Sequence, residues 1–165
     1  MERGHRNHGG MSRQMMRRHY LMFGLNMILS TIIMYVVMFE MIRGWGEFIQ
    51  NINFFYMALT MAMPMGALML LMMRSMYADR RLNLILYMVM GAISILSFAA
   101  VRTQALVGDK QFVRSMIPHH SGAILMCNEG SLRDAEVRGL CFAPTGIVAS
   151  QEREIAQMKA ILERL

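Results

Sequence analysis

Residues 116–127 read Met116-Ile117-Pro118-His119-His120-Ser121-Gly122-Ala123-Ile124-Leu125-Met126-Cys127. On a helix with about 100° between successive residues, the soft metal-ligand types of this stretch fall within an arc of about 120°, with Ala123 at its middle. These side chains are Met116, His119, His120, Met126 and Cys127. Pro118 lacks a backbone N–H and clashes with the preceding turn, so it either kinks this helix or starts it afresh. The stretch therefore predicts a helix with a polar histidine pair on one face.

Two interpretations of this face compete. Thioether, thiol and imidazole groups together are the ligands that soft Cu(I) selects, which favours a metal site. In the alternative, Met116, Met126 and Cys127 are ordinary core residues and the histidines are satisfied by hydrogen bonds. Zinc fits less well, because adjacent histidines followed by a cysteine seven residues later are not the usual spacing of a structural zinc site.

A longer pattern extends from this stretch: Asp109-x2-Phe112-x3-Met116-Ile117-Pro118-His119-His120-Ser121-Gly122-Ala123-Ile124, followed by Gln151-x2-Glu154-Ile155-x2-Met158. It resembles the DUF305 family of small helical, ferritin-like domains, and the preceding half resembles that of bacterial membrane proteins with a single DUF305 copy. The resemblance implies a cell-envelope protein, several of whose relatives are linked to copper binding or resistance. It also implies that the C-terminal region is a helical hairpin, equivalent to half of a ferritin-like four-helix bundle.

Three uncharged apolar runs precede this region, near residues 20–39, 52–73 and 84–101. Each approaches the length of about 20 residues that a helix needs to cross about 30 Å of hydrocarbon. They predict a membrane domain over residues 20–102, with a bend near Pro64 in the second helix. The predicted fold class is therefore all-α, with three transmembrane helices followed by an extramembrane helical domain over residues 103–165.

Arginines are concentrated on one side of these spans. Residues 1–19, a His/Met-rich tail, contain five arginines and the second loop contains three, whereas the first loop contains only Arg43. By the positive-inside rule, the tail is cytoplasmic and the C-terminal domain lies outside. We expect a multi-pass protein of a bacterial inner membrane with a periplasmic C-terminal domain. The tail also includes His5 and His8, which either hold a metal loosely or are simply solvated.

Methionine accounts for 22 of the 165 residues. Helical spacing relates methionines in the first two spans, namely Met27, Met34, Met38 and Met41, and then Met57, Met61, Met65, Met69, Met72 and Met76. Such stripes either pass Cu(I) or Ag(I) between weak sites or provide adaptable packing. None of the three apolar runs contains Asp, Glu, Lys, Arg or His, which argues against a proton-driven pump.

Two helices are predicted in the C-terminal domain. The first runs from Asp109, as its N-cap, to about Asn128. The second starts near Asp134, is interrupted at Pro144 and Gly146, and resumes near residue 147. Its apolar stripe includes three further candidates, which are the possible ligand Met158 and the possible second-shell residues Gln151 and Glu154. Alternatively, Glu154 lies in water at the edge of the stripe.

Cys127 and Cys141 both lie in the domain placed outside the membrane, where a disulfide is chemically allowed. A bridge would stabilise the fold by about 3 kcal/mol but would remove both sulfurs as thiolate ligands, so bridge and metal site are alternatives. A hairpin of about 57 residues is too small to bury a good core alone. We therefore expect that hairpins of two chains pair, or that the hairpin docks on the membrane helices.

These observations predict a membrane-anchored protein that captures or buffers Cu(I), or Ag(I), or confers resistance to it. The preferred ligands are Met116, His119, His120 and Met126, and the further ligands are Cys127, Cys141 and Met158. We do not expect an enzyme, because the C-terminal domain lacks the Glu-x-x-His spacing of ferritin-like redox sites. The expected partners are the lipid bilayer, a metal ion and a second copy of the chain, and not nucleic acid. The alternative is a structural or assembly module of the membrane.

Overall fold

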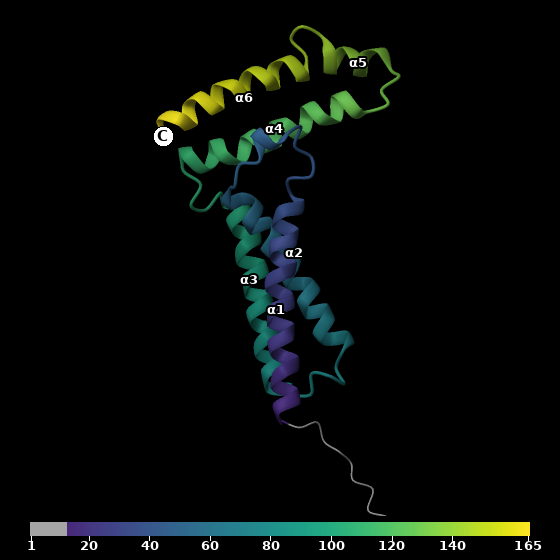
Figure 1. The fold of residues 1–165 in the computed structure, drawn as a ribbon, viewed down its shortest axis with the longest axis vertical. Helices are drawn as coiled ribbons and strands as arrows, with labels where there is room; N and C mark the ends of the chain where they lie inside the picture. Colours follow the sequence, from purple (N-terminus) through teal and green to yellow (C-terminus); the bar gives the residue numbers. More distant parts are fainter. Residues whose placement is uncertain (1–12) are drawn as a thin grey trace, which may run out of the picture.

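The computed structural model describes residues 13–165; His5 and His8 of the tail lie outside the described residues. The described chain is all-helical (Figure 1). Three long helices lie side by side as a bundle: α1 (Arg13–Val37), α2 (Ile52–Met72) and α3 (Arg80–Thr103). Three further helices lie across one end of it: α4 (Asp109–Glu129), α5 (Ala135–Phe142) and α6 (Ile147–Arg164). A short 3-10 helix, η1 (Trp45–Glu47), lies in the loop between α1 and α2.

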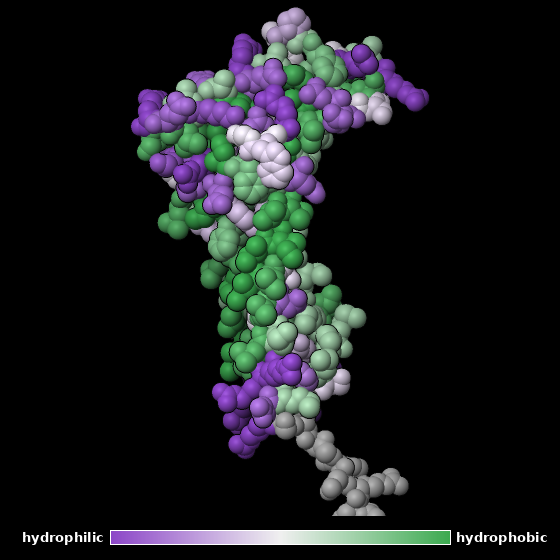
Figure 2. Space-filling model, viewed as in Figure 1, coloured by the Kyte–Doolittle hydropathy of each residue, from purple (hydrophilic) through white to green (hydrophobic). Residues whose placement is uncertain are grey.

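The bundle has the surface of a membrane protein. Each of α1, α2 and α3 is long and apolar enough to cross a membrane. Figure 2 shows a hydrophobic belt over the bundle, with hydrophilic surface at both ends. Many large apolar side chains of the belt are exposed, among them Leu21, Ile28, Leu84 and Ile95. A surface of this kind is stable in contact with lipid tails, which is consistent with a membrane protein.

The ends of the membrane helices differ from the predicted ones in places. Helix α1 begins at Arg13 rather than at Tyr20, because Arg, Gln and Met are good helix formers and continue the helix beyond the apolar run. Helix α3 begins at Arg80, since the Asp79 side chain accepts hydrogen bonds from the backbone N–H groups of Arg81 and Leu82. Pro64 lies inside α2, which continues through it.

The C-terminal domain consists of α4, α5 and α6, with α4 and α6 antiparallel along most of their length (Figure 1). Gly108 occupies the N-cap of α4, so Asp109 lies in the first turn and is not the cap predicted. Pro118 lies inside α4, which neither ends nor restarts there. Asp134 is the N-cap of α5, in agreement with the predicted start near Asp134, and the helix is interrupted between Phe142 and Ile147 as predicted. The core between α4 and α6 contains Val113, Ile117, Ile124, Ile155 and Met158.

A buried polar network joins this domain to the loop between α1 and α2. Ser121 of α4 is fully buried, accepts a 2.6 Å hydrogen bond from the backbone N–H of Arg43, and donates to the Glu47 carboxylate. The Arg43 guanidinium contacts Glu47 at 2.7 Å and Glu152 of α6 at 2.7 Å. The sequence left two ways of supporting this small domain, pairing of two chains or docking on the membrane helices. In the structure the domain is docked on the membrane half of the chain.

The loop also packs next to Gly122. A Cβ atom at this position would lie 3.5 Å from the Cβ of Met41, which is ordinary van der Waals contact. Beyond the network, the backbone N–H of Ile52 donates to the Gln111 side chain at 3.2 Å, and Asn53 donates to Ser115 at 3.2 Å. Helix α4 is therefore held to the membrane bundle along two of its turns.

Glu47 remains ionised although only 4% of it is exposed. Burial alone would raise the pKa of this carboxyl group. The hydrogen bonds from Ser121 and Arg43, with the charges of Arg43 and Lys159, outweigh burial and lower the pKa below its ordinary value of 4.5. The ionised carboxylate is thus the form that the folded structure stabilises.

We predict that acid loosens the docked domain. Because the pKa of Glu47 is lower in the folded than in the unfolded chain, its contribution is complete above pH 4.5 and is lost as the pH falls through the folded value. Thermal unfolding of the full chain in detergent, followed from about pH 6 to about pH 3, should show this loss. The Glu47→Gln variant should be less stable at about pH 6 and should lose less on acidification; an identical pH profile for both proteins would contradict the prediction.

Candidate metal site

His120 lies at the boundary between α4 and α6. Its side chain is 13% exposed, and its Nδ1 atom lies 3.0 Å from Oε2 of Glu154 on α6. This distance is that of an ion pair, but Nδ1 has no hydrogen bond of acceptable direction. The contact is therefore electrostatic, with the Glu154 carboxylate beside the ring and not in line with its N–H. The sequence left two positions open for Glu154, beside a histidine or in water, and the structure combines them, since the carboxylate contacts His120 and the side chain is 49% exposed.

The imidazole of His120 favours its neutral form. Burial lowers its pKa below the ordinary value, the charge of Glu154 raises it, and nearby His119 lowers it, with a net downward shift. The two imidazole rings are 6.1 Å apart between centroids. A neutral imidazole has a lone pair on one ring nitrogen, and this is the form that binds metals.

Two thioethers each lie one helical turn from the contact between His120 and Glu154. Met116 precedes His120 by one turn on α4, and Met158 follows Glu154 by one turn on α6. Because α4 and α6 are antiparallel, Met116 and Met158 lie on the same side of the His120–Glu154 contact along the interface. Met158 is 9% exposed and belongs to the core between the helices, and Met116 packs against that same core. The structure thus gathers Met116, His120 and Met158 on one interface.

The other two preferred ligands are not part of this group. His119 is exposed, and Met126 is 62% exposed. The predicted arc centred on Ala123, whereas the buried side of α4 centres on Ile117, Ser121 and Ile124, so the arc is divided between core and solvent. Gln151 is half-buried one turn before Glu154.

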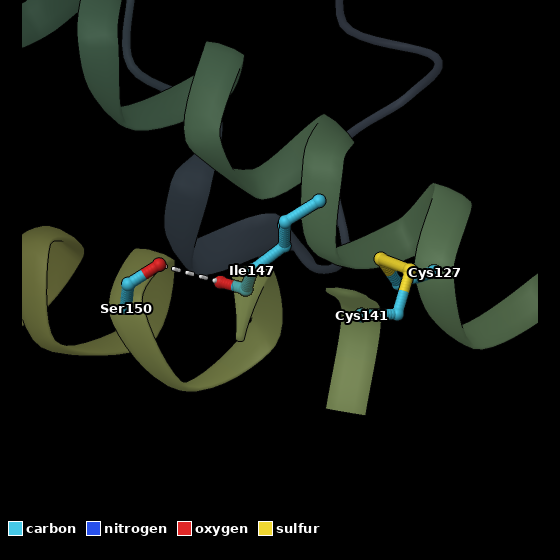
Figure 3. Close-up of a disulfide and its surroundings, with 4 residues drawn as sticks. All are labelled: Cys127, Cys141, Ile147 and Ser150. Carbon is cyan, nitrogen blue, oxygen red and sulfur yellow. Dashed lines mark hydrogen bonds between the residues drawn. A yellow bond between two sulfur atoms is a disulfide. The ribbon is translucent and has the colours of Figure 1, made fainter. Parts of the chain in front are cut away.

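Cys127 and Cys141 form a disulfide that joins α4 to α5 (Figure 3). Of the two alternatives left open by the sequence, the structure has the bridge. Neither sulfur is then a thiolate, so the further ligands predicted at these two positions are lost in this form. Within residues 13–165, no three or more His, Cys, Asp or Glu side chains are grouped so as to hold a metal ion. Any metal site at the interface of α4 and α6 therefore depends on the thioethers.

Sequence reasoning missed the Arg43, Glu47 and Ser121 network beside the histidines. The i, i+4 spacing of Arg43 and Glu47 indicates a local ion pair. Nothing local connects Ser121 to a loop that precedes it by 78 positions. The small residues after the histidines were the available indication, since a Ser-Gly pair inside a helix permits a close backbone approach.

Comparison with known proteins identifies the family of this chain. An uncharacterized protein of Acanthamoeba polyphaga mimivirus, L153, is 35% identical over 120 residues, which are 72% of this chain and 75% of that protein. Residues 88–162 match the family described as "Domain of unknown function (DUF305)". The chain belongs to the DUF305 family. The DUF305 match begins within α3, so it includes part of the last membrane helix as well as the C-terminal domain. No solved structure matches significantly.

We predict that removal of the bridge destabilises the C-terminal domain of this DUF305 protein. Chain-entropy arguments give a loss of about 3 kcal/mol for a loop of this length in the Cys127→Ser/Cys141→Ser variant. Denaturant unfolding of the full chain in detergent measures it. Reductant should lower the stability of the parent to that of the variant and leave the variant unchanged. Two free thiols in protein that has never met reductant would contradict the bridge.

Proposed function

We propose that this DUF305 protein is a membrane-anchored metal-binding protein that captures or buffers Cu(I), with Ag(I) as the second candidate. Its ligands are Met116, His120 and Met158. The observation that carries the proposal is the placement of one neutral imidazole and two thioethers on a single helix interface. This donor set is soft, and soft sulfur ligands select Cu(I) over hard divalent ions such as Mg²⁺.

The surroundings of His120 fit the role of a ligand. Glu154 lies beside Nδ1 and biases the ring toward keeping its proton there, which leaves Nε2 as the donor atom. The apolar core of Ile117, Ile155 and their neighbours limits access of water, so competition from water as a ligand is reduced. The protein binds and holds the ion, and we assign it no catalytic step.

The compartment follows from the charges at the two ends of the bundle. Arginines at the start of α1 and around the loop between α2 and α3 lie at the end opposite the C-terminal domain (Figure 1). The positive-inside rule then puts this domain outside. We place the protein in a bacterial inner membrane with α4–α6 in the periplasm, where a role in copper resistance would be exercised. The disulfide supports an oxidising compartment.

Assembly of two copies is part of the proposal. Helix α5 exposes three apolar side chains, Val137, Leu140 and Phe142, at 42%, 63% and 48%. Pairing of two C-terminal domains would cover such a surface and would complete a ferritin-like four-helix bundle from two halves.

A structural role of the same motif is the second candidate. Ser121 and Gly122 pack against the loop between α1 and α2, while His119 projects to solvent. On this reading the histidine-containing turn serves docking. Replacement of both histidines by Asn would then lower stability without changing any metal affinity.

We predict that the detergent-purified full chain binds Cu(I) in anaerobic competition with a chromophoric chelator. The His120→Ala variant and the Met116→Leu/Met158→Leu variant should each lose affinity, since each removes ligands. The matched control is His119→Ala/Met126→Leu, which removes the same residue types from exposed positions and should bind as the parent does. A parent that cannot compete with a weak chelator, or a control that loses as much as the ligand variants, would favour the structural role.

We also predict a separate effect of Glu154. Replacement by Gln keeps the size of the side chain and removes the charge beside Nδ1, which should weaken Cu(I) binding about 10–100-fold, the usual cost of losing a partner of a metal-binding histidine. Glu163→Gln, on an exposed position of the same helix, is the control. Equal affinities of the Glu154→Gln and Glu163→Gln variants would remove Glu154 from the site.

A further inference from the structure

A second group of thioethers lies inside the membrane bundle. Met27 of α1, Met63 of α2 and Met90 of α3 line a cleft of about 250 Å³, together with Phe23. Met63 is 8% exposed and Met90 is 5% exposed, and Met27 packs against the same core. Each membrane helix therefore contributes one methionine to the same part of the bundle.

Gly66 makes this convergence possible. A Cβ atom at Gly66 would lie 2.4 Å from the sulfur of Met27 and 3.0 Å from the sulfur of Met90. Since both distances are measured from one point, the two sulfurs cannot be further apart than the two distances combined. Met63 lies one turn before Gly66 on α2 and is buried on the same side. The thioethers of Met27 and Met90 thus lie against the backbone of one glycine of α2, and Met63 lines the same cleft.

The position of this group restricts what it can bind. Met27, Met63 and Met90 all lie near the middle of their helices, away from both polar ends of the bundle. None of the three apolar runs contains an ionisable side chain of the Asp, Glu, Lys, Arg or His types. A hard cation would find no charged ligand there to replace its water. A soft monovalent ion exchanges its water for thioether sulfur readily.

The regular methionine stripe of α2 is a different set of residues. Met57, Met61, Met65 and Met72 are 38%, 46%, 57% and 77% exposed, so most of the stripe faces lipid. Met63 lies off this stripe and faces the other helices. Met61 and Met65, which flank Met63 in the sequence, offer the same functional group at a similar depth but on the lipid-facing side.

We propose that Met27, Met63 and Met90 form a soft-metal site inside the membrane bundle, which binds one Cu(I) or Ag(I) ion through three thioethers. The site is separate from Met116, His120 and Met158 and does not depend on them. A membrane-embedded site gives the protein a way to hold a soft ion between the two faces of the bilayer.

The test starts from a full chain that lacks the proposed C-terminal ligands, the Met116→Leu/His120→Ala/Met158→Leu variant in detergent. Titration with Ag(I), which undergoes no redox change, should still show one bound equivalent. X-ray absorption of the Cu(I) form should show only sulfur in the first shell. With Cys127 and Cys141 bridged, this sulfur comes from methionine.

Two further changes locate the ion. Adding Met27→Leu/Met90→Leu to that chain should weaken Ag(I) binding by at least about tenfold. The change removes two ligands, which is a larger loss than removing the hydrogen-bond partner of one ligand. The matched control, Met61→Leu/Met65→Leu, removes as many thioethers from the lipid-facing side and should leave the affinity unchanged. Leu for Met conserves volume, and the helical circular dichroism should be unchanged.

Gly66→Ala is an independent test, because it keeps every methionine. Its Cβ would displace the Met27 sulfur, so Ag(I) binding should weaken although the sulfur count is the same. Absence of a bound equivalent in the starting variant would overturn the intramembrane site, as would equal losses in the Met27/Met90 and Met61/Met65 pairs. The C-terminal site is judged separately, by comparing the parent chain with its His120→Ala variant.

Discussion

The buried carboxylate of Glu47 is the interaction on which the arrangement of the C-terminal domain depends. An ionised carboxylate cannot remain buried without partners, and here the partners come from different parts of the chain. Ser121 supplies a hydroxyl from α4, and Arg43 supplies a guanidinium that also reaches Glu152 on α6. Glu47 and Arg43 therefore hold α4 and α6 against the loop between α1 and α2.

This constraint also determines where the histidines point. Successive side chains on a helix diverge by about 100°, so fixing Ser121 toward the loop turns His120 toward α6 and leaves His119 in solvent. Gly122 lies next to Met41 of that loop. The short sequence Pro-His-His-Ser-Gly thus faces the loop, α6 and solvent on three different sides of one helix. Only His120 combines a shielded position with a neighbouring carboxylate, and this separates its chemistry from that of the adjacent histidine.

The sequence predicted the helices better than their contacts. Three apolar runs could only become helices in lipid, because every backbone N–H and C=O must be paired within the segment. Asp134, Pro144 and Gly146 marked the ends of α5 and the start of α6, since caps and breakers act locally. The start of α1 was wrong because charge ends an apolar run and does not end a helix. At the site, spacing left Glu154 either beside a histidine or in water, and it did not separate half-buried His120 from exposed His119.

Periodicity misleads in the membrane for a related reason. In water an apolar stripe marks the packed side of a helix, but in lipid both sides are apolar, so a stripe no longer indicates the interior. The methionines of α2 show this, because the regular series of Met57, Met61 and Met65 is exposed while Met63 is buried. The interior is marked instead by the small residue that lets neighbouring helices approach. Gly66 is that residue in α2, and the sulfurs of Met27 and Met90 lie directly against it. In a chain with 22 methionines, small residues in the membrane helices are therefore the better guide to which thioethers face one another.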